Sequence, residues 1–214
     1  MEKSQLDLES SRQMFLFVSQ KLQASKGYLT DLDKAIGDGD HGIGMARGFE
    51  AVQHELEKQS FDSIGKLLHS IGTTLMMSIG GASGAIFGTM FRGGASKLND
   101  EHKFTSRVLS QMLMDGLESV KLRGGAKAGD KTMVDALEPA AIKSRELADA
   151  PLYQALIAVS EEARQGMEKT KSMRANTGKA KTMGERVLGH VDPGSASTYL
   201  LLKYMMDFAT ASQA

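Results

Sequence analysis

The sequence contains no cysteine and no tryptophan, only 3 prolines among 214 residues, and no excess charge of either sign. Without cysteine the chain has no disulfide, thiolate zinc site or cysteine nucleophile. Its 26 basic and 26 acidic residues cancel, so nothing global attracts it to nucleic acid or to an anionic membrane. The longest apolar run, MFLFV at 14–18, is too short for a signal-peptide core or a membrane span. We therefore expect a cytoplasmic protein with neither nucleic acid nor membrane as a partner.

Helical signals dominate the rest of the chain. Runs rich in Ala, Leu, Met, Lys and Glu favour helix, and alternating β-branched residues are scarce. No repeat, low-complexity tract or linker divides the chain, so residues 1–214 are expected to form a single domain. The apolar spacing predicts helices over 5–26, 43–58, 61–79, 83–97, 104–122, 131–148, 151–170 and 194–211, with a long loop near 171–191. We expect an all-α bundle or barrel.

The three prolines refine these boundaries. Pro151 and Pro193 each suit the first turn of a helix, and Asp192 is a suitable N-cap before Pro193. Pro139 falls inside an expected helix and predicts a kink or a break there.

The stretch LDKAIGDGDHGIGMARG, residues 32–48, gathers Asp33, Asp38 and Asp40 among five glycines. GDGDHG formally matches G-x-G-x-x-G, but no strand is expected before it, and its aspartates would repel a bare pyrophosphate. A calcium loop is excluded because Gly42 stands where a third oxygen ligand is needed. Magnesium suits one or two protein carboxylates per ion, with water and phosphate oxygens completing its shell. On this loop alone, a magnesium site and a solvated acidic turn remain equally good interpretations.

Three further stretches bear on the function. SIGGASGAIFG (78–88) is a small-residue turn opening into a helix, with Ser83 near its N-cap. Its backbone amides suit a phosphate, and its small side chains equally suit a tight helix crossing. GERVLGHVDPG (184–194) ends in a capped helix start that suits an anion or ordinary helix punctuation. GGAKAGDKT (124–132) imitates a phosphate loop but has an extra Asp and no preceding strand. His41 lies in a glycine-flanked loop, where a lone histidine is more often a surface residue than a ligand.

Taken in order, LDKAIGDGDHG, GGASG, RGGAKAGDKTM and MGERVLGHVDPG, spread over residues 28–194, resemble the nucleotide-binding L subunit of dihydroxyacetone kinases. The resemblance implies a barrel of about eight antiparallel helices that holds ADP or ATP at one end through Mg²⁺, as two ions. It places the metal ligands at Asp33, Asp38 and Asp40. The nucleotide-binding positions that it implies are His41, Gly42, Ile43, Gly44, Ala82, Ser83, Gly124, Met133, Lys179, Asp192, Pro193 and Gly194.

The resemblance also implies an activity and partners. The nucleotide would transfer a phosphoryl group to dihydroxyacetone, or to a related short ketose, held on a separate K subunit. The stand-alone length and the DHG sequence are most similar to the phosphotransferase-system branch, in which bound ADP is rephosphorylated by a phosphohistidine M subunit using phosphoenolpyruvate. An ATP-dependent ketose kinase subunit and a non-catalytic nucleotide-binding regulatory module remain as alternatives, and a homodimer stays open. No catalytic residue of this chain itself is assigned.

Two positions depart from the family pattern. Gly44 stands where relatives often have Asn, so one amide near the phosphates is lost. Lys179 stands where relatives have Arg, and lysine cannot make the planar, bidentate contact of a guanidinium. Both departures bear on nucleotide retention and substrate identity more than on the fold.

Overall fold

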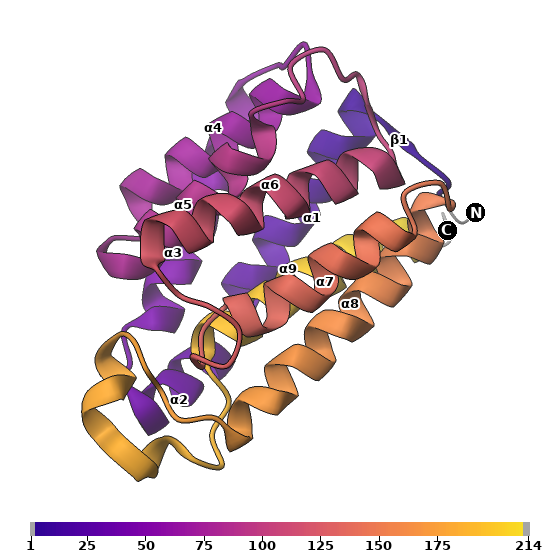
Figure 1. Cartoon of the computed structure of the whole chain (residues 1–214). Helices are drawn as coiled ribbons and strands as arrows, with labels where there is room; N and C mark the ends of the chain where they lie inside the picture. The colour runs from indigo at the N-terminus through magenta and orange to yellow at the C-terminus, as the bar shows by residue number, and fades with distance from the viewer. Residues whose placement is uncertain (1–2, 212–214) are drawn as a thin grey trace.

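A ring of helices makes up most of the chain, and the computed structural model describes residues 3–211 of it (Figure 1). The α-helices of this described part are α1 (Leu8–Ala24), α2 (Lys26–Ile36), α3 (His41–Lys58), α4 (Ile64–Ser78), α5 (Gly81–Ala95), α6 (Ser106–Gly124), α7 (Val134–Glu146), α8 (Leu152–Lys169) and α9 (Pro193–Thr210). Short 3₁₀ helices, η1 (Thr170–Ser172) and η2 (Lys179–Val187), lie between α8 and α9.

Eight of these helices form a closed, up-and-down barrel. Each of α3 to α8 packs against the next helix in chain order, and α1 closes the ring by packing against both α9 and α3. The remaining helix, α2, packs across one end, against α3, α9 and η2. The expected all-α barrel of about eight antiparallel helices is therefore confirmed. None of the helices in residues 3–211 is long and apolar enough to cross a membrane.

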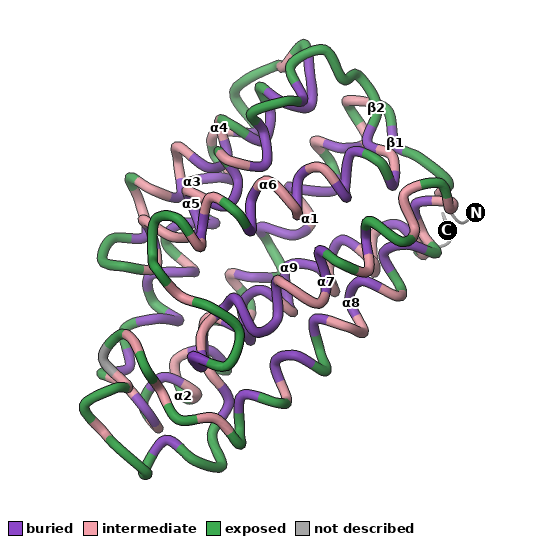
Figure 2. The backbone as a smooth tube through the Cα atoms, viewed as in Figure 1, coloured by how far each residue is buried: buried purple, intermediate pink, exposed green. Residues whose placement is uncertain are grey.

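Buried residues follow the inner sides of the helices (Figure 2). Within this core, the ring of Phe15 on α1 meets those of Phe91 and Phe104 edge to face, with centroids 6.0 and 6.1 Å apart. All three rings are fully buried, and such aromatic pairs stabilise a core beyond the area they bury. The barrel interior is thus filled with side chains.

A two-stranded antiparallel pair that the sequence did not predict lies near the chain ends. It joins β1 (Leu6–Asp7) to β2 (Lys103–Phe104), with Leu6 opposite Phe104. The described part of the chain begins and ends at this end of the barrel, while α2 and η2 lie at the other (Figure 1).

The prediction of one helix over 5–26 was wrong at its C-terminal end, because α1 ends at Ala24 and a separate helix follows. The chain turns at Ser25, and α2 follows at once, with Gly27 inside its first turn rather than ending the helix. Glycine costs a helix only about 1 kcal/mol relative to alanine, so a single glycine does not by itself end a helix. Leu29, Asp33 and Ile36 share the buried face of α2.

The proline predictions had mixed outcomes. Pro193 begins α9 behind the Asp192 N-cap, as expected, whereas Pro151 is itself the N-cap of α8. Pro139 does not break α7, which runs uninterrupted through it. Proline cannot donate to the carbonyl of Asp135, and that carbonyl lies against Gly166 of α8, where a Cβ would come within 2.1 Å. The helix therefore continues because its neighbour accommodates the exposed carbonyl.

Candidate functional site

Four helices begin at the end of the barrel that α2 covers. Because alternate helices of the ring run in opposite directions, α3, α5, α7 and α9 all start there, around a pocket of about 520 Å³. The first N–H groups of a helix lack intrahelical partners and carry partial positive charge. Their convergence makes this pocket suited to an anion with several charged groups.

Three carboxylates lie together on one wall of this pocket. Asp33 lies near the end of α2, and Asp38 and Asp40 lie in the loop before α3. One oxygen from each lies within 4.8 Å of the others. Carboxylates that close repel one another at neutral pH, so the cluster is suited to a hard cation bound by oxygen ligands.

Glycines allow the loop to bring these acids together. A Cβ at Gly37 would come within 2.2 Å of Asp33 Oδ1. Gly39 has φ +78°, in the left-handed region that favours glycine. A second restraint comes from the backbone N–H of His41, which donates to Asp33 Oδ2 at 3.1 Å. The glycines of this loop thus serve to orient carboxylates.

His41 is buried, contrary to the expectation for a lone loop histidine. Its Nδ1 lies 3.1 Å from Ser83 Oγ on α5, and its Nε2 lies 2.8 Å from Ser197 Oγ on α9. Burial lowers the pKa of His41 below its ordinary value, although Asp33 and Asp40 oppose this shift. The ring therefore joins three helix starts as a neutral hydrogen-bonding group.

The turn between α4 and α5 forms a second wall. Gly80 and Gly81 have φ values of +79° and +59°, and Gly80 is the N-cap of α5. Ser83 lies in the first turn, near the N-cap as expected, and its hydroxyl faces His41. Residues 81–83 therefore present first-turn N–H groups at the pocket wall.

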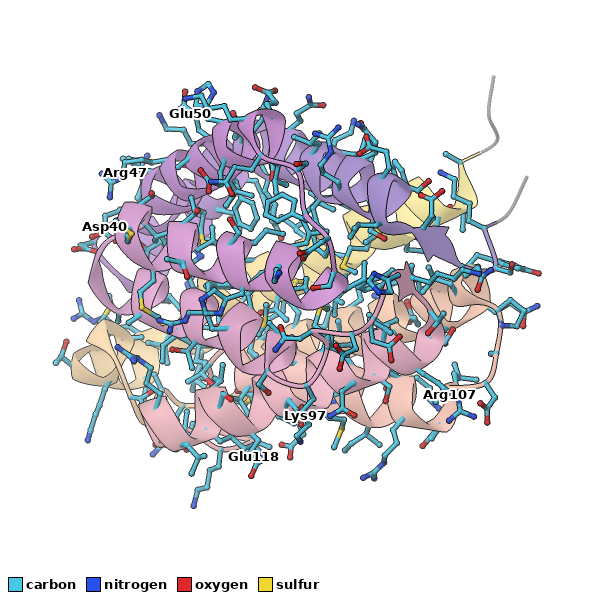
Figure 3. All side chains as sticks on the ribbon, turned by 90° about the horizontal axis from the view of Figure 1, so that it is seen from above. Asp40, Arg47, Glu50, Lys97, Arg107 and Glu118 are labelled. Carbon is cyan, nitrogen blue, oxygen red and sulfur yellow. The ribbon has the colours of Figure 1, made fainter. Side chains whose placement is uncertain are left out.

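Arg47, which the sequence did not single out, fixes this turn from α3. Its Nε donates to the carbonyl of Ser78 at 2.7 Å, and its Nη2 donates to that of Ile79 at 2.5 Å. Both carbonyls lie at the end of α4, where the helix dipole is negative. Arg47 and Asp40 lie at the same end of the molecule, far from Arg107 (Figure 3). The guanidinium thus covers negative backbone groups beside an anion-suited pocket.

Gly44 has a packing role in this chain. A Cβ at Gly44 would lie 3.2 Å from both Cγ2 and the carbonyl oxygen of Ile79, and one at Gly48 would lie 2.3 Å from Ile79 Cγ1. Ile79 therefore fills the groove that the two glycines leave on α3. The isoleucine accounts for the missing side chain at position 44.

The starts of α7 and α9 form the third wall. Asp192 Oδ2 accepts the N–H of Ser195 at 2.6 Å, which confirms the expected N-cap. Burial raises the pKa of Asp192 to about 7, although the Ser195 N–H and Lys131 oppose this shift. Asp135 accepts the N–H groups of Gly129 and Thr132, at 2.5 and 2.7 Å, and so fixes the turn before α7.

The segment between α8 and α9 closes the pocket from the side, through Thr177, Gly178 and Ala180. Asn176 Nδ2 donates to Asp130 Oδ1 at 2.9 Å, and the Asn176 backbone N–H donates to the Asp130 carbonyl at 3.2 Å. Hydrogen bonds from the Lys127 N–H and from Asn176 hold the pKa of Asp130 below its usual value. The segment is therefore anchored to the loop before α7.

The structure brings most of the predicted site residues to this one pocket. Gly42 instead packs on α2, where a Cβ would come within 2.3 Å of Thr30 Oγ1, and Gly124 ends α6 behind Ile86. The side chain of Lys179 lies outside the part of the chain that the structure describes. The predicted residues that line the pocket are Asp33, Asp38, Asp40, His41, Ile43, Gly44, Ala82, Ser83, Met133, Asp192, Pro193 and Gly194.

Several lining residues were not predicted. Arg47 and Phe87 lie within helices, and Lys131 and Thr132 belong to the stretch that imitates a phosphate loop. Ser197, which bonds to His41, lies one turn into α9. An apolar wall of Ile36, Ile43, Ile79, Ile86 and Phe87 faces these polar groups. The pocket is therefore suited to a molecule that has both a charged and an apolar part.

Comparison with known proteins agrees with this geometry. The family model of the DAK2 domain matches residues 35–207. The chain is 40% identical over 180 residues to the PEP-dependent dihydroxyacetone kinase, ADP-binding subunit DhaL, of Escherichia coli (strain K12), covering 83% of this chain and 86% of that protein. It is 36% identical over 189 residues to the ADP-binding subunit DhaL of PEP-dependent dihydroxyacetone kinase 1 from Listeria innocua serovar 6a, covering 87% and 89%.

A solved structure shares the fold. It is the dihydroxyacetone kinase from C. freundii in complex with AMP-PNP and Mg²⁺, with a TM-score of 0.71 and 28% identity. The match covers 92% of this chain but 33% of that longer one. The present chain thus corresponds to about a third of that kinase.

Proposed function

The chain belongs to the DAK2 domain family, and on this basis we propose that it is the ADP-binding subunit of a dihydroxyacetone kinase that depends on phosphoenolpyruvate. In this role it transfers a phosphoryl group from the bound nucleotide to dihydroxyacetone, or to a related short ketose, on a separate K subunit. A phosphohistidine M subunit then rephosphorylates the nucleotide. Residues 1–214 act together as one nucleotide-binding domain.

One observation carries this proposal: the aspartate cluster and four helix starts share a single pocket. Carboxylates alone would repel a phosphate, and helix starts alone would not require acids beside them. A polyphosphate bound together with divalent cations satisfies both groups. The names of the relatives, which specify ADP binding, support the same ligand.

The side chains fit magnesium by their chemistry. The cluster offers hard oxygen ligands only, and Mg²⁺ takes one or two protein carboxylates while keeping water and phosphate oxygens. Three carboxylates are therefore suited to two ions. His41 is not a competing ligand, because Ser83 and Ser197 occupy both of its ring nitrogens. When bound, Mg²⁺ supplies positive charge that offsets the charge of the transferred phosphoryl group.

The chain's own residues bind and orient the nucleotide. First-turn N–H groups of α5, together with the N–H of Gly194 in α9, would donate to phosphate oxygens. His41 keeps these two helix starts in register through its serine partners. The apolar wall excludes water from the other side of the pocket. Ketose activation belongs to the K partner in this account, so this chain contributes binding and orientation of the donor.

Reconstitution tests the proposal. The protein is combined with K and M partners, phosphoenolpyruvate and dihydroxyacetone, and the phosphorylated ketose is measured, with erythrulose as a second substrate. We expect product that depends on this chain and on catalytic amounts of ADP. Activity supported by ATP without an M partner would favour the ATP-dependent kinase instead. Inactivity with every ketose, in spite of nucleotide binding, would favour a regulatory module.

A further inference from the structure

Lys131 is buried and lies in an unusual backbone conformation. Only 2% of the residue is exposed, and burial lowers the pKa of its amine, although Asp192 and Asp135 oppose this shift. Its φ of +60° is the only positive value at a non-glycine residue in the described part of the chain. A lysine there costs both backbone strain and desolvation, so its side chain must make a compensating contact.

That contact joins two segments that are remote in sequence. The ammonium Nζ donates to the carbonyl oxygens of Thr170 and His190, each at 2.5 Å. Thr170 follows the end of α8, and His190 lies two residues before the N-cap of α9. Thr170 Oγ1 also accepts the backbone N–H of Asp192 at 3.0 Å. The ammonium therefore closes the base of the whole segment between α8 and α9.

The residues on both sides of this clamp belong to the pocket. Thr132 and Met133 follow Lys131, and Asp192 to Gly194 follow His190. These two stretches of the chain are in contact, since a Cβ at Gly194 would lie 3.5 Å from Met133 Cβ. Lys131 thus fixes the start of α9 relative to the start of α7. It also covers a carbonyl at the end of α8, whose partial negative charge would otherwise disfavour a nearby anion.

We propose that Lys131 is a positioning residue of the nucleotide site, whose ammonium holds the starts of α7 and α9 in the arrangement that binds Mg–ADP. This inference rests on the proposed function, because it assumes the ligand. It assigns Lys131 a role through the carbonyls of Thr170 and His190.

The absence of cysteine permits an atom-level test. In a Lys131→Cys variant the single thiol is alkylated in denaturant, and the protein is refolded. Treatment with 2-bromoethylamine restores an ammonium at lysine length, and treatment with 1-bromopropane gives a neutral side chain of equal length. We expect the propyl form to bind Mg–ADP about tenfold or more weakly, as for other supporting partners of a site, and the aminoethyl form to bind like the wild type.

Control proteins separate a loss of Mg–ADP affinity caused by the missing ammonium from one caused by lower stability, and from the case in which Mg–ADP is not the ligand. Val108→Ala creates a cavity at the opposite end of the barrel and should lower the melting temperature without changing Mg–ADP affinity. Equal affinity of the propyl and aminoethyl forms would overturn the role of Lys131. If the propyl form does not refold, Lys131→Met is expressed directly, and wild-type affinity in it would also overturn the role. Failure of the wild type to bind Mg–ADP would instead refute the proposed function.

Discussion

The carboxylates of Asp33, Asp38 and Asp40 lie within 4.8 Å of one another, which is unfavourable without a cation. We therefore predict that Mg²⁺ raises the melting temperature of the nucleotide-free protein, because an ion that binds only the folded state stabilises it. In Asp38→Ala this increase should disappear, because one carboxylate of the cluster is lost. Thermal unfolding with EDTA and with excess Mg²⁺ measures the response of each protein.

Asp31→Ala is the matched control for this prediction. Asp31 is an exposed acid on α2, the helix that carries Asp33, and it pairs with Lys34 at 3.4 Å outside the cluster. It should keep the full response to Mg²⁺. The same response in Asp38→Ala would remove the metal assignment.

The raised pKa of Asp192 leads us to predict that the free energy of unfolding depends on pH. Burial raises its pKa from 3.8 to about 7, so between these pH values the folded chain holds a proton that the unfolded chain releases. The free energy of unfolding therefore falls as the pH rises through this window. Asparagine keeps a capping oxygen but does not titrate. Relative to the wild type, the free energy of unfolding of Asp192→Asn should increase by about 3 kcal/mol between pH 4.5 and pH 7.5.

Urea unfolding of both proteins at the two pH values, with EDTA and without nucleotide, checks this prediction. Other carboxyl groups titrate alike in the two proteins, so their contributions cancel in the difference. A difference that does not change with pH would show that Asp192 is ionised throughout.

At the scale of single residues, the sequence indicated those polar site residues that lie near glycines in loops or at the start of a helix. Asp33, Ser83 and Asp192 were predicted because loops and helix starts place polar atoms in known ways. Arg47 and Ser197 were missed because they lie inside helices, and their partners are carbonyl and ring atoms of other elements. Lys131 was missed because its partners are 39 and 59 residues away.

At the scale of the elements, α3 packs closely against the turn after α4, because Gly44 and Gly48 on α3 leave room for Ile79. Gly48→Ala should lower the free energy of unfolding by about 2 kcal/mol, since its Cβ would lie 2.3 Å from Ile79 Cγ1. Helix propensity alone predicts the opposite sign, because alanine favours helix over glycine. Chemical denaturation measures the change.

Gly27→Ala is the control within the chain. Gly27 lies in α2, and no heavy atom lies within 4 Å of a Cβ added there. This substitution should stabilise the protein by about 0.5 kcal/mol. The same sign for both substitutions would contradict the packing of Ile79 against α3.

The turn between α4 and α5 also depends on Arg47. Arg47→Met should weaken Mg–ADP binding by about tenfold, because the carbonyls of Ser78 and Ile79 beside the pocket would then have no positive group on them. The loss of stability should be small, about 1 kcal/mol, because Arg47 is exposed. Titration calorimetry and thermal unfolding measure the two effects separately.

Arg107→Met serves as the control for this substitution, since Arg107 pairs with Asp149 in an exposed ion pair away from Arg47 (Figure 3). It should leave nucleotide affinity unchanged. Unchanged affinity in Arg47→Met as well would exclude a role for the guanidinium at the site.

Helix existence was largely predictable, but exact helix ends were not. Apolar spacing indicated eight of the nine α-helices in residues 3–211. It missed α2 because Gly27 was taken as a stop, although a single glycine does not by itself end a helix. Of the kink or break expected at Pro139, the break did not occur, because Gly166 leaves room for the carbonyl of Asp135. Both outcomes depend on neighbouring helices, which local sequence does not specify.

At the scale of the whole molecule, the order and direction of the helices around the ring determine at which end the pocket forms. With eight helices alternating in direction, four start at one end, and the described part of the chain begins and ends at the other (Figure 1). The sequence predicted a helical barrel, and the family resemblance predicted a nucleotide at one end. The eight helices that periodicity predicted, alternating in direction, already place the starts of α3, α5, α7 and α9 at one end. What periodicity missed is α2, which covers that end without joining the ring.

The central claim is that this pocket holds ADP together with Mg²⁺, and the nucleotide content of the purified protein tests it most directly. The protein is dialysed, denatured, and the released nucleotide is identified by chromatography, with Asp40→Ala treated in parallel. We predict about one ADP per wild-type chain, retained through dialysis because tight binding implies slow release, and none from Asp40→Ala. A wild-type protein that releases no nucleotide and turns over exchangeable ATP would contradict the account.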